Sequence, residues 1–294
     1  LNMKNRPNFT NTIEEWSNFF IPLNDGVQLA ARAWLPTNAI EQPVPAILEY
    51  IPYRKRDGTA IRDEQMHPYW AAFGYACVRV DIRGSGESDG LLLDEYLQQE
   101  LEDAVEVIGW LEQQDWCSGK VGMMGKSWGG FNSLQVAALR PAALKAIITV
   151  CSTDDRYADD IHYRGGALLI ENFSWASTIS CYMAKSPDPL LLPETWREHW
   201  LERLQNMPLF ARNWLEHTYK DAYWKHGSIN EDYSAIEAAV YCVGGWGDAY
   251  SVAIPRIMQG LSGPKKALIG PWAHKYPNFA SPKPEMDFLA EAKR

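Results

Sequence analysis

Long apolar runs are missing from this sequence of 294 residues. No stretch approaches the roughly 18 uncharged apolar residues that a membrane-spanning helix needs, and this excludes a transmembrane protein. The N-terminal segment also has no apolar stretch of the kind that forms a signal peptide. Leu1 is not an initiator methionine, so we expect the first residues to be a cloning remnant or the edge of a longer sequence.

Positive charge is scarce. The chain has 28 Lys and Arg against 37 Asp and Glu, a formal net charge of -9. A nucleic-acid-binding protein needs a basic patch, but the only basic cluster, Arg54-Lys55-Arg56, is short and is followed by Asp57. Nucleic acid is therefore excluded as a partner, and the excess acidity mainly serves solubility.

Cysteines are few and are not spaced as metal or disulfide motifs. There are five, an odd number, and no CxxC pair occurs. Neither a zinc site nor a disulfide framework is indicated, and we expect no metal and no cofactor. Most of the cysteines lie in apolar segments, as Cys77 and Cys242 do, which predicts buried, reduced thiols in a cytoplasmic protein.

The composition is that of a globular protein. Apolar residues make up 46% and charged residues 22%, which excludes a disordered, collagen-like or coiled-coil chain. The length allows one large domain or two modest ones. Thirteen tryptophans are present, and residues of this kind usually line cores or pockets.

Short apolar runs alternate with helical patterns in the first half of the chain. The expected strands cover about 19–23, 27–35, 44–53, 75–84, 120–125 and 144–152, and the expected helices about 65–73, 91–114 and 127–139. The turn Asn24-Asp25-Gly26 predicts a hairpin between the first two strands. The later alternation predicts βαβ units and a mostly parallel sheet.

Residues 153–236 interrupt this alternation. They carry helical patterns over 167–184, 194–206 and 208–218 but no convincing strand, and strands resume at 238–245 and 265–272. We therefore expect one α/β domain in two parts, 1–152 and 237–294, with 153–236 inserted as a helical cap.

A candidate nucleophile lies in the motif Gly125-Lys126-Ser127-Trp128-Gly129. This is G-x-S-x-G between a predicted strand and a predicted helix, the arrangement of a nucleophile elbow, in which the serine oxygen stands clear of the backbone. The alternative is an ordinary glycine-rich turn in which Ser127 only caps the helix.

A serine hydroxyl needs a base, and the base needs an acid that orients it. In the α/β-hydrolase layout both follow the serine, on loops after later strands. Asp248 follows the strand at 238–245, and His274 is the histidine that follows a late core strand. The alternatives are a turn aspartate and a surface histidine.

Acyl transfer also needs donors for the developing oxyanion. The amide of Trp128, directly after the nucleophile, is one candidate. The loop after the third strand lacks the HGGG run of many lipases, so a side-chain donor is expected there, and Tyr53 is placed to give its hydroxyl. Alternatively, the Tyr53 ring only packs at the pocket wall.

Five blocks resemble the CocE/NonD hydrolases, the superfamily of cocaine esterase, X-Pro dipeptidyl-peptidase, α-amino-acid ester hydrolase and glutaryl acylase. The blocks are IPYRKRD (51–57), VDIRGSGESDG (80–90), WCSGKVGMMGKSWGGF (116–131), VGGWGDAY (243–250) and GPWAHKYP (270–277). The resemblance implies an α/β-hydrolase fold and a serine hydrolase. It implies a catalytic triad of Ser127, Asp248 and His274. It further implies an oxyanion hole of Tyr53 with the Trp128 amide, and a structural, non-catalytic loop at 81–86.

A weaker similarity concerns the acidic stretch 152–166. It resembles a segment of the amino-acid ester hydrolases in which a carboxylate helps to bind the substrate ammonium, and Asp160 is the matching position. The alternative is a solvated acidic turn with Arg156 and Arg164 as neighbours.

Members of the superfamily continue into a β-rich jelly-roll domain, whereas this sequence ends inside an apparent helix whose apolar face includes Met286, Leu289 and Ala290. We therefore expect the sequence to be part of a longer protein that packs against such a domain, and the isolated part to expose an apolar patch and self-associate.

These observations predict a serine hydrolase that cleaves an ester or amide through an acyl-enzyme, with a small-molecule or short-peptide substrate. An X-Pro dipeptidyl aminopeptidase is the alternative activity. A catalytically inactive binding module is the alternative of another class, against which the intact triad and Tyr53 argue. The sequence leaves a homo-oligomer open.

Overall fold

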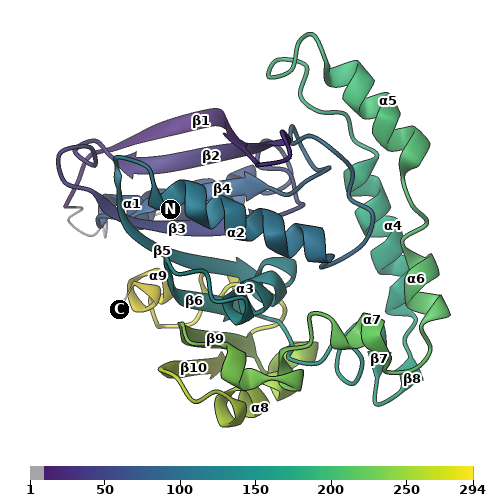
Figure 1. Cartoon of the computed structure of the whole chain (residues 1–294). Coiled ribbons are helices and arrows are strands. Elements are labelled where there is room, and N and C mark those ends of the chain that lie inside the picture. Colours follow the sequence, from purple (N-terminus) through teal and green to yellow (C-terminus); the bar gives the residue numbers. More distant parts are fainter. Residues whose placement is uncertain (1–9, 294) are drawn as a thin grey trace.

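A central eight-stranded sheet organises the computed structural model, which describes residues 10–293. The strand order is β1-β2-β4-β3-β5-β6-β9-β10 (Figure 1). β1 pairs antiparallel with β2, and β2 pairs antiparallel with β4, while all later neighbours are parallel. The predicted α/β fold with a mostly parallel sheet is confirmed. The expectation about Leu1 lies outside the described residues.

The strands follow the predicted apolar runs, with shifts of a few residues at their ends. Their bounds are β1 Ile13–Pro22, β2 Gln28–Pro36, β3 Val44–Ile51, β4 Ala76–Asp81, β5 Cys117–Lys126, β6 Leu144–Val150, β9 Ala239–Gly245 and β10 Lys265–Gly270. Side chains of β4 are buried all along the strand, as expected where both faces of a parallel sheet are covered.

The first two strands form the predicted hairpin. Pro22 lies opposite Gln28, and Gly26 takes a φ of 89°, which glycine adopts without steric cost. β1 starts at Ile13, six residues earlier than the sequence predicted, because its N-terminal half also pairs with β2.

Helices cover both faces of the sheet. α1 (Ala60–Ala72) packs against β2 and β4, and α9 (Phe288–Ala292) lies beside it. α2 (Gln98–Glu112), α3 (Trp128–Ala138) and α8 (Ala253–Gly260) pack on the other face (Figure 1). Short 3-10 turns occupy Ile229–Glu231, Tyr233–Ala235, Ala249–Val252 and Pro277–Phe279.

The predicted helix at 91–114 was wrong in its first part. α2 begins only at Gln98, and residues 91–97 form a loop. Tyr96 has a φ of 54°, which a right-handed helix does not allow. This loop forms part of the wall of the site described below.

The segment between β6 and β9 leaves the sheet and carries four helices to one side of it (Figure 1). They are α4 Glu171–Met183, α5 Trp196–Asn206, α6 Ala211–Glu216 and α7 Ala222–Lys225. The sequence predicted no strand here, which was wrong: β7 (Tyr163–Arg164) and β8 (Ala167–Leu168) form a small hairpin. Gly165 and Gly166 make its turn, both at positive φ.

The C-terminal helix begins later than predicted. It starts at Phe288, after Met286, and the Phe288 side chain is buried. The Trp70 indole donates a hydrogen bond of 3.0 Å to the Leu289 carbonyl, which fixes α9 against α1.

Four of the five cysteines are buried, and all five are free. The exception to the predicted burial is Cys181 in α4, which is exposed. None of the helices in residues 10–293 is both long and apolar enough to cross a membrane.

Candidate active site

Ser127 lies at a sharp turn between β5, which ends at Lys126, and α3, which begins at Trp128. Its backbone has φ 57° and ψ -120°, a conformation that costs free energy for any residue with a side chain. The Ser127 amide donates to the Val150 carbonyl at 2.8 Å. The side chain makes no capping hydrogen bond, so the alternative of a mere helix-capping serine is wrong.

The turn is possible because the residues around Ser127 are small. A Cβ atom on Gly125 would lie 2.4 Å from the Gly129 backbone, which is closer than real atoms approach. The two flanking glycines of the motif therefore touch each other across the turn. This contact lets the strand and the helix meet at the angle that exposes Ser127.

Asp248 and His274 form the predicted acid–base pair in space. His274 Nδ1 lies 2.9 Å from Asp248 Oδ1, with 1% of the aspartate side chain and 39% of the histidine side chain exposed. Burial by itself raises the pKa of Asp248, but the hydrogen bond and the charge of His274 outweigh it and lower this pKa overall. Each residue follows the end of a neighbouring strand, β9 or β10.

A cavity of about 430 Å³ brings Ser127, Asp248 and His274 together. Five aromatic residues also line it: Tyr96, Trp128, Phe131, Trp175 and Tyr250. A larger hollow elsewhere runs along one face of the sheet and contains none of the predicted site residues. Their catalytic roles remain a prediction, which the shared cavity makes geometrically possible.

The two residues that carry the predicted oxyanion donors pack against each other through their rings. The rings of Tyr53 and Trp128 meet edge to face, with centroids 6.4 Å apart, and Tyr53 packs in the same way against Trp175. Trp128 and Trp175 line the cavity, whereas Tyr53 is not one of its lining residues. Burial raises the pKa of the Tyr53 hydroxyl well above its usual range, so the group keeps its proton and can donate a hydrogen bond.

Asp160 also reaches the cavity. It is 4% exposed, so the alternative of a solvated acidic turn is wrong. Its Oδ1 atom accepts from the Tyr250 hydroxyl at 2.8 Å and from the Ile161 amide at 2.7 Å. Burial raises the pKa of this carboxyl. The neighbouring Asp159 instead pairs with Arg164, at 2.9 Å.

Sequence reasoning missed two polar residues of the cavity wall, His162 and Glu95. His162 Nε2 lies 2.8 Å from Glu95 Oε2, and the Trp175 indole donates to the other oxygen of Glu95. The opposite ring nitrogen of His162 lies 2.8 Å from Asn172 Oδ1. Burial opposes the charged forms of His162 and Glu95. Their mutual attraction outweighs this effect, so the pKa of His162 is raised and that of Glu95 is lowered. A histidine within the acidic stretch 152–166 was the available signal.

Glu100 lies behind Trp128 and is almost fully buried. It accepts hydrogen bonds from the Trp128 indole at 2.7 Å, from the Asn132 amide at 3.2 Å and from the Tyr96 backbone at 2.9 Å. Burial raises the pKa of Glu100 to about 7, although these three donors act in the opposite direction. The residue fixes the tryptophan whose backbone amide is the predicted oxyanion donor.

Two groups of side chains have the donor types of a metal site. Cys151, Asp248 and His274 place one donor atom each within 4.8 Å of one another, and so do Glu49, Asp63 and His67. The first group includes the acid–base pair itself. In the second, Arg62 Nη2 lies 2.6 Å from both carboxylates and supplies the positive charge. The absence of a metal and a cofactor remains a prediction.

Comparison with known proteins gives consistent matches. The sequence model of the X-Pro dipeptidyl-peptidase (S15) family matches residues 25–276. The cocaine esterase of Rhodococcus sp. (strain MB1 Bresler) is 28% identical over 284 residues, covering 88% of this chain and 48% of the esterase.

Solved structures share the fold. A CocE/NonD family hydrolase from Staphylococcus aureus superposes with a TM-score of 0.69 at 19% identity, covering 87% of this chain and 46% of that one. An α-amino-acid ester hydrolase gives 0.64 at 21% identity, covering 95% of this chain and 52% of that one. The chain thus spans about half the length of these relatives.

Proposed function

This chain belongs to the X-Pro dipeptidyl-peptidase (S15) family, and from that membership we propose that it is a serine hydrolase of ester or amide acyl bonds. The observation that supports this proposal most strongly is that Ser127 and the Asp248–His274 pair line one cavity. The strained turn at Ser127 supports it further, because such strain is typical of catalytic positions. Ester substrates agree with the name of the similar cocaine esterase.

The proposed reaction follows from these positions. His274 Nε2 removes the proton of the Ser127 hydroxyl while Ser127 Oγ attacks the substrate carbonyl carbon. Asp248 accepts from His274 Nδ1–H and stabilises the imidazolium that forms. The Trp128 amide and the Tyr53 hydroxyl donate to the tetrahedral oxyanion.

Collapse of this intermediate completes the first half of the reaction. The carbon–oxygen or carbon–nitrogen bond of the leaving group breaks, and His274 gives it the proton taken from Ser127. Water then attacks the acyl-enzyme with His274 again as base, which releases the acid and restores Ser127.

The nucleophile is tested by exchange and by covalent labelling. Ser127→Ala should lower turnover by several orders of magnitude, since triad removals in comparable enzymes cost on the order of 10⁶, with an unchanged unfolding transition. A fluorophosphonate probe should modify the peptide that contains Ser127. Ser174→Ala, on the exposed surface of α4, is the matched control. Labelling at another serine would overturn the assignment, and no labelling at all would favour an inactive binding module.

A second proposal concerns the substrate amine. Asp160 is a buried carboxylate on the cavity wall, and such a group favours a substrate that brings a positive charge to it. We propose that it binds the ammonium of an aminoacyl ester or, in the X-Pro dipeptidyl aminopeptidase alternative, of a peptide N-terminus.

Paired substrates test this role of Asp160. An aminoacyl ester should react faster than the same ester without its amino group, by 10-fold or more, because an unpaired buried charge costs roughly 1–3 kcal/mol or more. The preference should vanish in Asp160→Asn. Equal rates of both esters with the unaltered protein would contradict the proposal.

We also propose a cytoplasmic location. Its support is that all five cysteines of the chain are free, four of them buried, as expected of a protein in a reducing compartment. Cell fractionation with an antibody against the protein would test it.

A further inference from the structure

The turn that follows β3 carries Tyr53 and contains unusually buried charges. The Lys55 side chain is completely buried, with its Nζ 2.8 Å from Glu87 Oε2 and 2.7 Å from Asn18 Oδ1. From the sequence, Arg54-Lys55-Arg56 was interpreted as a short basic cluster. The structure corrects this: Arg54 and Lys55 point inward, and only Arg56 is exposed.

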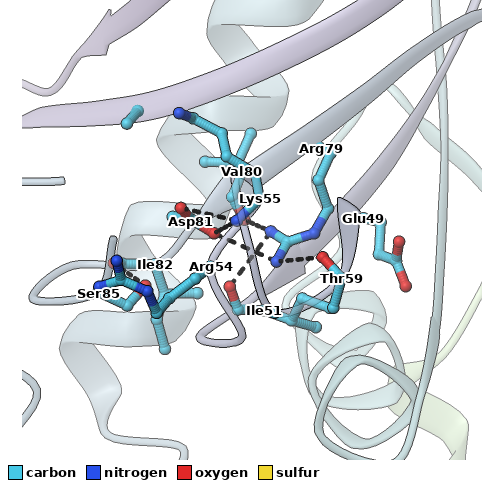
Figure 2. Close-up of polar contacts among 12 residues, drawn as sticks. Glu49, Ile51, Arg54, Lys55, Thr59, Arg79, Val80, Asp81, Ile82 and Ser85 are labelled. Carbon is cyan, nitrogen blue, oxygen red and sulfur yellow. Dashed lines mark hydrogen bonds and ion pairs between the residues drawn. The ribbon is translucent and has the colours of Figure 1, made fainter. Parts of the chain in front are cut away.

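Asp81, the last residue of β4, holds the backbone of this turn. Both of its carboxylate oxygens accept from the Lys55 amide, at 3.0 and 3.1 Å (Figure 2). Arg79 Nη2 lies 3.1 Å from the same carboxylate and balances its charge. A Cβ on Gly86 would lie 2.1 Å from Asp81 Oδ2, so the Asp81 carboxylate packs directly against the Gly86 backbone.

Arg79 joins the two ends of the turn. It donates to the Ile51 carbonyl at 3.3 Å, where β3 ends, and to the Thr59 hydroxyl at 3.5 Å, just before α1 (Figure 2). Arg79 and Asp81 are both buried, so no water screens these contacts. The polar side chains at the end of β4 thus fix the start, the middle and the end of the turn.

The backbone between these points is strained. Arg54 has a φ of 61°, an unfavourable value for a residue with a side chain. A Cβ on Gly58 would lie 2.1 Å from the Tyr53 carbonyl oxygen, so the chain folds back tightly on itself there. Arg54 lies directly between Tyr53 and Lys55, so the strained residue is flanked by the predicted oxyanion donor and by the amide that Asp81 holds.

We propose that Asp81 is a positioning residue for catalysis: by holding the Lys55 amide it keeps the strained turn in the conformation that directs the Tyr53 hydroxyl to the oxyanion. The inference rests on the proposed role of Tyr53. Asp81 is not among the residues that line the cavity, and its hydrogen bonds to the Lys55 amide connect it to the turn instead.

A double-mutant cycle of Asp81→Asn and Tyr53→Phe tests the inference on the full chain. Tyr53→Phe should lower kcat by roughly 10²–10³, as loss of one oxyanion donor does. Asp81→Asn should lower kcat by roughly 10-fold or more with little change in KM, since a displacement of about 1 Å can cost 10²-fold. In the Tyr53→Phe background, Asp81→Asn should change kcat by less than about 3-fold.

Two further variants separate positioning from general destabilisation. Asp103→Asn removes another buried carboxylate, which is paired with Arg83 at 2.7 Å and not with the Lys55 amide, and should lower stability without lowering kcat. If Asp81→Asn does not fold, Asn18→Ala provides a milder change, because it removes only one acceptor of Lys55 Nζ. It should lower kcat 2- to 5-fold, and again only when Tyr53 is present.

The possible failures are distinguishable. If Asp81→Asn lowered kcat equally in the unaltered protein and in Tyr53→Phe, the positioning role would be overturned, while the proposed hydrolase function would stand. Full activity of Tyr53→Phe would overturn the role of the hydroxyl, and with it this inference, while labelling of Ser127 would still report the hydrolase.

Discussion

The protonation state of the buried residue Glu100 affects the stability of the whole fold. Burial raises its pKa from 4.5 to about 7. Between these two pH values the folded state keeps the proton of Glu100, whereas the unfolded chain releases it. Stability therefore falls as pH rises through this window, by about 3 kcal/mol from this residue alone.

Glu100→Gln removes this titration. The difference in unfolding free energy between Glu100→Gln and the unaltered protein should shift in favour of the variant between pH 5 and pH 8, by up to about 3 kcal/mol. Any packing cost of the substitution is the same at every pH and does not alter this trend. Urea unfolding at several pH values measures the difference. Glu102→Gln, at the exposed neighbouring position on α2, should show no such trend, and parallel pH profiles of Glu100→Gln and the unaltered protein would contradict the prediction.

Residues differ in how far the sequence could predict their positions in the site. Ser127 follows β5 directly, and Asp248 and His274 come three and four residues after the ends of β9 and β10. The local pattern was therefore enough to place all three at the same edge of the sheet. The partnership of His162 with Glu95 could not be predicted in this way, because it joins the segment 153–236 to a loop 67 residues away in the chain. Lys55 is a similar case: only the fold reveals its buried partners.

Among the elements, the connection from β5 to α3 depends on one glycine contact. Gly125→Ala would place a Cβ 2.4 Å from the Gly129 backbone, and backbone cannot move aside as a flexible side chain can. We expect a loss of stability of roughly 1–3 kcal/mol and a fall in kcat of at least 10-fold, since Ser127 would move.

A matched glycine gives the control for this prediction. Gly109 lies inside α2, and an added Cβ there would meet nothing within 4 Å. Gly109→Ala should stabilise the protein by about 0.5–1 kcal/mol and leave kcat unchanged. Thermal unfolding and steady-state kinetics on both variants check the pair, and an active, stable Gly125→Ala protein would show that the turn adapts.

Element boundaries were less predictable than element types. Apolar periodicity indicated the strands of the main sheet, because burial on both faces leaves a clear pattern. It extended the helix predicted at 91–114 too far toward its N-terminus. Residues 91–97 are apolar and acidic, a composition that a helix can also have, but they are held by contacts with the segment 153–236. Asp94 in that loop accepts from the Trp214 indole at 3.1 Å and from the Tyr223 hydroxyl at 2.8 Å, contacts that no local pattern encodes.

At the scale of the whole molecule, the segment 153–236 is fastened to the sheet domain by buried polar contacts. Arg203 of α5 is 4% exposed and donates to the Gly86 carbonyl at 2.7 Å and to the Ser88 carbonyl. Burial lowers the pKa of Arg203 to about 10. A guanidinium in this position holds α5 against the loop that follows β4.

Arg203→Met should loosen this attachment. Methionine keeps the apolar stem but removes bonds worth roughly 1.5–3 kcal/mol, so local opening of α5 should become about 10- to 100-fold more frequent. Limited proteolysis should then cut within 153–236 correspondingly faster. Arg197→Met, at an exposed position of the same helix, is the control, and equal cleavage of both variants would contradict the prediction.

The backbone of Ser127 has a consequence for evolution. Its φ of 57° costs a residue with a side chain about 1 kcal/mol or more, a cost that glycine would avoid. Selection for stability alone would therefore replace this serine. A duplicated copy of the gene that was released from selection for hydrolysis would be expected to drift to glycine here and gain stability. The presence of serine at this strained position is what the proposed catalytic role of Ser127 predicts.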